Sequence, residues 1–199
     1  MKFNYQGFKA IYLHEMDRFK RTLAQSLISP VLSTSLYFIV FGSVIGGYVE
    51  NIDGISYGSY IVPGLLMLTL LTQSISNTSF GIFFPKFNGT IYEILAAPIS
   101  TFEIVLAFVG AGATKTLIVG CMIFITSLFF VDVSVKYPLL MIFLLLLVSF
   151  TFALFGFLIG LMSTNFEQMS IIPTLAVSYT HLRAHETLRY LVCRLLLEK

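Results

Sequence analysis

Four long apolar runs constrain the fold of this chain more than any other feature of its sequence. They cover residues 31–49, about 60–84, 104–131 and 139–162, and together they contain a single charged residue, Lys115. A helix rises about 1.5 Å per residue, so roughly 20 apolar residues cover the roughly 30 Å hydrocarbon core of a bilayer. Only 11% of the residues are charged, against about a quarter in soluble domains. The sequence therefore predicts an all-α, multi-pass transmembrane protein with four full spans.

The residues before these runs predict a different kind of helix. Apolar residues recur every three or four positions between residues 8 and 27, and most charged residues fall off this stripe. We expect an N-terminal interfacial helix that lies on the membrane surface. Ser29 and Pro30 then resemble the N-cap and first turn of the first span, because the missing N–H of proline matters least there.

The distribution of basic residues predicts the orientation. The arm before the first span contains five Lys and Arg residues, whereas segment 50–58 is short and acidic and contains none. The positive-inside rule places the N-terminus in the cytoplasm and segment 50–58 outside.

The last part of the chain departs from this pattern. Residues 163–168 are expected to return to the cytoplasm, and residues 169–177 begin a fifth apolar run. At Ser178 the composition changes abruptly to a peptide that resembles translated sequencing adapter. We therefore expect an incomplete transmembrane domain at residues 1–177 and a non-native tail at residues 178–199. The alternative is a genuine amphipathic helix in the tail.

Polar residues inside the runs are candidates for function. Lys115 lies at membrane depth, where an unpaired charge costs several kcal/mol, so it is a candidate intramembrane polar site. An equally weighted alternative is that its long side chain reaches the cytoplasmic face or a neighbouring carbonyl. Hydroxyls and amides in the second half of run 60–84 could line a polar path, although such groups more often bond their own backbone or a neighbouring helix. Gly156 and Gly160 have a spacing that could seat another helix.

One polar segment, residues 84–103, interrupts the two central runs. Its charged residues are Lys86, Glu93 and Glu103, and it also contains Gly89 and Pro98. If the flanking runs span a bilayer, this segment is a loop on the cytoplasmic side. We interpret it as the contact through which another protein drives the membrane part.

The sequence carries no catalytic motif. It has no GxxxxGK[ST] phosphate loop, no HExxH and no GxSxG. Cys121 and Cys193 lack the spacing of metal ligands. Basic and acidic residues balance outside the tail, so there is no footprint for nucleic acid. We predict no catalytic, cofactor or metal site, and any ATP hydrolysis must take place on a separate subunit.

Several stretches resemble the permease subunits of type-2 ABC exporters, and most closely the bacterial inner-membrane transport permeases. They are the arm from Glu15 to Pro30, LYFIVFGSVIG, SYIVPGLLM and GTIYEILAAPISTFE. The last is the most specific, because the family has an acid, a short apolar step, a proline and a small hydroxyl residue in this order. Here these are Glu93, residues 94–97, Pro98 and Ser100.

The resemblance implies a six-helix permease of the bacterial inner membrane with both termini in the cytoplasm. It also implies that the permease pairs with a second copy and with two ATPase subunits, which dock on segments 8–27 and 86–103. The residues carried over for ATPase coupling are Lys86, Glu93, Pro98, Ser100, Glu103, Glu15, Arg18 and Arg21. The resemblance allows drugs, lipid-linked glycans or other amphiphiles as cargo.

Two alternatives remain from the residues alone. An ion-coupled carrier or channel would need acids inside the spans, and the runs offer only Lys115. A non-transporting membrane assembly subunit would bind a partner through the loop without dependence on nucleotide.

Overall fold

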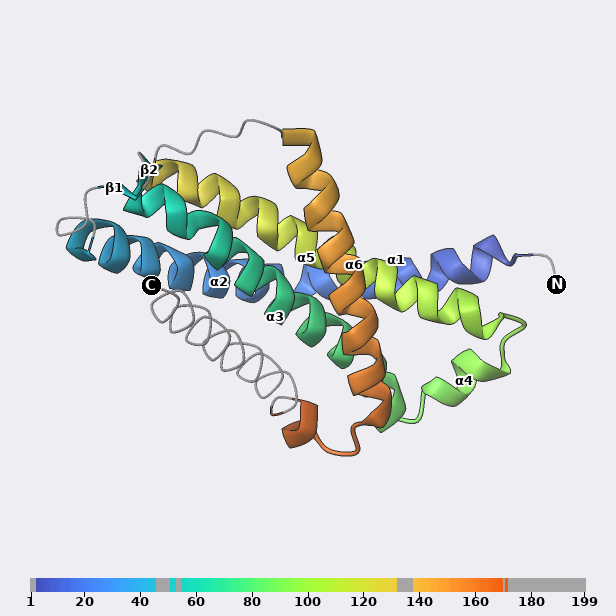
Figure 1. The fold of residues 1–199 in the computed structure, drawn as a ribbon. Helices are drawn as coiled ribbons and strands as arrows, with labels where there is room; N and C mark the ends of the chain where they lie inside the picture. Colours follow the sequence, from blue (N-terminus) through green and yellow to red (C-terminus); the bar gives the residue numbers. More distant parts are fainter. Residues whose placement is uncertain (1–2, 46–50, 53–54, 132–137, 170, 172–199) are drawn as a thin grey trace, which may run out of the picture.

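The computed structural model describes residues 3–45, 51–52, 55–131, 138–169 and 171, and this part is almost entirely helical (Figure 1). The helices are α1 (Tyr5–Arg21), α2 (Leu23–Tyr37), α3 (Tyr57–Phe87), α4 (Ile91–Ala96), α5 (Thr101–Phe130) and α6 (Pro138–Met162). A π-helical stretch, η1 (Phe38–Ile45), follows α2 directly, and the two-residue strands β1 (Asn51–Ile52) and β2 (Ile55–Ser56) pair in antiparallel fashion before α3.

Helix α3 is the centre of the bundle. It packs against α6 and α5, and α5 in turn packs against α1 and α2 (Figure 1). The main apolar core lies where α3, α5 and α6 meet, and it includes Ile82, Phe108 and Phe157. Between helices surrounded by lipid, close packing of such side chains provides the stabilisation.

Small residues allow α6 to approach α3 closely. A Cβ atom added at Gly156 would lie 2.5 Å from the carbonyl oxygen of Ile75, and one added at Gly160 would lie 2.6 Å from that of Ser79. Glycine at these positions is therefore a packing requirement, and the predicted role of the Gly156–Gly160 pair as a seat for another helix is confirmed.

Three helices in the described part are long and apolar enough to cross a membrane: residues Leu23–Phe41, Thr101–Phe130 and Pro138–Met162. They correspond to the first, third and fourth predicted spans. The second predicted span forms the 31-residue α3. That helix is long enough, but Gln73, Asn77 and the neighbouring hydroxyl residues make its second half more polar than the other three helices.

The prediction that the first span begins at Ser29 and Pro30 is wrong. Helix α2 begins at Leu23, and Pro30 lies inside it. The break falls at Thr22, whose hydroxyl donates to the carbonyl oxygens of Arg18 and Phe19, both at 3.3 Å, and so terminates α1. The amphipathic helix expected over residues 8–27 accordingly ends at Arg21.

Two predicted features lie outside the described residues. They are the external turn at residues 132–137 and the tail at residues 178–199. Most of the fifth apolar run, residues 169–177, also lies outside them.

Candidate functional site

The start of α1, helix α4 and the start of α5 meet at one end of the bundle, which we call the α4 end (Figure 1). The backbone N–H of Asn4 donates to Glu103 Oε1 at 2.5 Å, and the side-chain amide of Asn4 donates to the carbonyl oxygen of Pro98 at 3.1 Å. Gly7 lies so close to Ile99 that a Cβ atom there would be 2.7 Å from its side chain. The start of the N-terminal helix is therefore hydrogen-bonded to, and packed against, the region between α4 and α5.

Glu103 also completes the N-terminal cap of α5. The Ser100 N–H donates to Glu103 Oε2 at 2.8 Å, while the Glu103 N–H donates to Ser100 Oγ at 3.4 Å. These reciprocal bonds form a capping box, which satisfies backbone donors that a helix start leaves free. The two carboxylate oxygens of Glu103 thus hold α5 and α1 together, and the side chain is buried.

Lys86 connects two other helices at the same end. Its ammonium group donates to the carbonyl oxygens of Leu161 and Ser163 at 2.6 and 2.9 Å. A cation at these unpaired carbonyls stabilises the C-terminus of α6, since the helix dipole is negative there. The predicted site residue Lys86 therefore ties the last turn of α3 to the end of α6.

Helix α4 presents a different surface from its neighbours. Glu93 is exposed, and so are large side chains around it: Tyr92 is 74% exposed and Leu95 is 58% exposed. Phe87 and Phe102, which flank the helix in sequence, are also exposed. Exposed aromatic and aliphatic side chains around an acid form a surface that is suited to contact another protein.

The two charged residues Glu15 and Lys115 form an ion pair inside the bundle. Lys115 Nζ donates to Glu15 Oε2 at 2.7 Å, and each side chain is 3% exposed. Arg18 contacts the same carboxylate oxygen at 2.8 Å. Lys115 therefore does not reach an open face or a helix carbonyl, as one alternative held, because its partner is an acid of α1.

The other predicted coupling residue of α1, Arg21, is exposed in the last turn of that helix. Nearby, Lys20 donates to Asp17 at 2.9 Å, and this hydrogen bond and the charge of Lys20 hold the pKa of the Asp17 carboxyl below its usual value. The structure thus divides the predicted α1 residues, with Glu15 buried against α5 and Arg21 on the surface.

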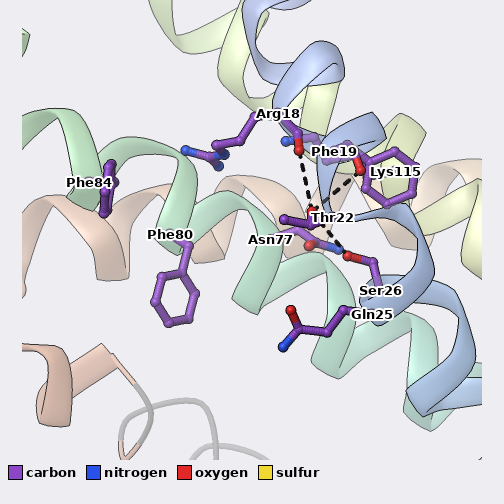
Figure 2. Close-up of a pocket in the computed structure, with 9 residues that line it drawn as sticks. All are labelled: Arg18, Phe19, Thr22, Gln25, Ser26, Asn77, Phe80, Phe84 and Lys115. Carbon is purple, nitrogen blue, oxygen red and sulfur yellow. Dashed lines mark hydrogen bonds between the residues drawn. The ribbon is translucent and has the colours of Figure 1, made fainter.

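A pocket of about 450 Å³ lies beside the ion pair, where the α1–α2 junction faces α3 (Figure 2). Its lining combines two cations, two amides, two hydroxyls and three aromatic rings: Arg18, Lys115, Gln25, Asn77, Thr22, Ser26, Phe19, Phe80 and Phe84. Among the described residues no cluster of His, Cys, Asp and Glu has the arrangement of a metal site.

Three hydroxyl groups of α3 bond to a backbone. Thr69 and Thr72 donate to carbonyl oxygens four residues earlier at 2.8 and 3.0 Å, and Ser79 donates to the Gly156 carbonyl of α6 at 2.8 Å. In the polar second half of the run, backbone bonding is therefore confirmed for Thr72 and Ser79. Ser74 and Thr78 differ, since their buried hydroxyls have no hydrogen-bond partner in the described part of the chain.

The sequence could have shown some of these contacts. Ser100 and Glu103 form the S-x-x-E pattern that precedes an apolar run, which is the usual signature of a capping box. The pairing of Glu15 with Lys115 has no such signal, because the residues are 100 positions apart.

Comparison with known proteins identifies the family to which the chain belongs. The sequence profile of the ABC-2 type transporter family matches residues 6–182. The inner membrane transport permease YadH of Escherichia coli strain K12 is 36% identical over 172 residues, which are 86% of this chain and 67% of that protein. The YadH proteins of Escherichia coli O157:H7 and Shigella flexneri match to the same extent. No solved structure matches the chain significantly. The chain belongs to the ABC-2 type transporter family and is a transport permease of that family.

Proposed function

We propose that this chain is the membrane-spanning subunit of an ATP-driven exporter. Two copies form the translocation path, and two separate ATPase subunits supply the energy by hydrolysing ATP. Membership of the ABC-2 family supports an ABC ATPase as the partner. The cargo is an amphiphile, either drug-like or bearing a glycan or lipid.

The observation that carries this proposal is the construction of the α4 end. Its exposed helix α4 is short, but it continues into α5 through a capped start that also holds Asn4 of α1. Lys86, on the other side of α4, ties α3 to α6. A force applied to α4 by a partner would therefore reach four long helices as a rigid-body displacement.

The predicted topology supports the same assignment. The basic N-terminal arm favours a cytoplasmic location. The α4 end shares this side, since it contains the start of α1, and ATP is available there. In this arrangement α3 is a further span, and α1 lies at the interface between lipid head groups and water.

The proposal is tested by co-purification of ATPase activity with the tagged chain from bacterial membranes. We expect Glu93→Arg to reduce the recovered ATPase at least severalfold, because it reverses an exposed charge in the docking surface. Glu93→Gln, which only removes the charge, should reduce it less. Both variants should elute as the wild type does. Equal ATPase recovery from the wild type and Glu93→Arg would refute docking through α4.

A further inference from the structure

We infer that the pocket between the α1–α2 junction, α3 and α5 binds the negatively charged head group of an amphiphile. The inference rests on the proposed function in one respect, since it places α2 and α3 in a membrane from which such a molecule enters. It adds a site and a charge that the proposed function leaves open.

The charges beside the pocket do not cancel. Arg18 and Lys115 share one carboxylate oxygen of Glu15, at 2.8 and 2.7 Å, so the cluster has one positive charge in excess. Both cations line the pocket, whereas Glu15 is not among the lining residues, and none of these is an acid. The side chain of Arg18 is 32% exposed and lines the pocket, so an anion bound there would neutralise the excess charge through a charge-assisted contact.

The polar donors are placed to complete the contact. Figure 2 shows Arg18 extending from α1 toward α3, and the amides of Asn77 and Gln25 also line the pocket. A guanidinium group binds phosphate or carboxylate oxygens in a charge-assisted and often bidentate manner. Side-chain amides supply further N–H donors to the same oxygens.

The apolar part of the lining argues for an amphiphile rather than a soluble anion. Phe80 and Phe84 are one helical turn apart on α3 and remain 45% and 47% exposed. They line the same pocket as Arg18 (Figure 2). An aromatic surface next to a cationic group matches a molecule with an apolar body and an anionic head.

The test is equilibrium binding of dioctanoyl phosphatidylglycerol and dioctanoyl phosphatidylcholine to the purified full chain in detergent. These lipids have the same acyl chains, but only the first has net negative charge. We expect the anionic lipid to bind about tenfold more tightly. Arg18→Gln should abolish this preference, while Lys9→Gln, which changes an exposed cation of the same helix, should retain it.

A second variant keeps the test valid if Arg18→Gln fails to fold. Phe80→Ala should weaken the binding of both lipids to a similar degree, and the protein should still prefer the anionic one. Equal affinity of the wild type for the two lipids would overturn the inference, as would an unchanged preference in Arg18→Gln. Displacement of the lipid by inorganic phosphate in the same concentration range would also overturn it, because the ligand would then be a soluble anion.

This test is separable from that of the proposed function. Lipid binding is measured without an ATPase, and ATPase recovery is measured with the Glu93 variants, which leave the pocket unchanged. Lipid selectivity without a co-purifying ATPase would leave the site intact and contradict the proposed partner. The converse result would contradict only the site.

Discussion

Lys115, near the middle of α5, donates to Glu15 of α1 at 2.7 Å, and both side chains are almost completely excluded from solvent. The two residues are 100 positions apart in sequence. The pair fixes α1 against α5 about three turns below the capping box that holds the start of α1. Two separate contacts therefore prevent α1 from moving independently of α5.

Removal of Lys115 should destabilise the protein, because the carboxylate of Glu15 stays buried. We expect Lys115→Leu to lower the free energy of unfolding by about 1–3 kcal/mol, because the buried Glu15 carboxylate loses one of its two cationic partners and keeps only Arg18. Membrane insertion should remain intact, since an apolar residue favours a span. Unfolding in denaturing detergent and a topology reporter measure the two effects.

A double-mutant cycle separates the ion pair from the packing of its side chains. The variant that combines Glu15→Gln with Lys115→Leu should be more stable than the sum of the single effects predicts, because neither a buried carboxylate nor a buried ammonium group is left without the other. Additive effects would show that the two residues do not interact.

Glu103→Ala should loosen the α4 end. The change removes the capping box and the acceptor for Asn4, and loss of a cap alone costs about 0.5–2 kcal/mol. We expect faster hydrogen exchange in the first turns of both α1 and α5. Glu93→Ala, at an exposed acid of α4, is the matched control and should leave exchange in both turns unchanged. Faster exchange in α5 alone would contradict the link to α1.

The contact between α6 and α3 predicts opposite effects for two glycine substitutions. Gly156→Ala would place a methyl group 2.5 Å from the Ile75 carbonyl oxygen, so overpacking should cost about 1–3 kcal/mol. Gly64→Ala has no atom within 4 Å and should be neutral, or stabilising by up to about 1 kcal/mol. Thermal unfolding of the two variants checks the order. A Gly156→Ala variant as stable as Gly64→Ala would contradict close helix packing.

The long helices could be predicted from the sequence because lipid-compatible runs leave few alternatives. The predicted runs 104–131 and 139–162 match α5 and α6 within three residues at each end. The start of α2 could not be predicted in this way. Pro30 is acceptable both at a first turn and inside a helix that neighbouring helices support, and local sequence does not distinguish the two.

The candidate site was predicted in part. The sequence marked segment 84–103 and Lys115. Periodicity put Glu15 off the apolar stripe of the N-terminal helix, and only the family resemblance made it a candidate site residue. Its burial depends on α5 offering a buried ammonium group, which is a tertiary contact. The same holds for Lys86, whose partners are carbonyl oxygens at the far end of another helix.

The central claim is that α4 is the surface on which the ATPase docks. Its most direct test is site-specific photo-crosslinking from an aromatic ketone amino acid placed at Leu95 of α4. Leu139 is the control, because it is an equally large, 83% exposed residue at the start of α6, the opposite end of that helix from the Lys86 contact. We expect an adduct with an ATP-binding subunit from position 95 and none from position 139. No such adduct from position 95, or equal adducts from both positions, would contradict the account.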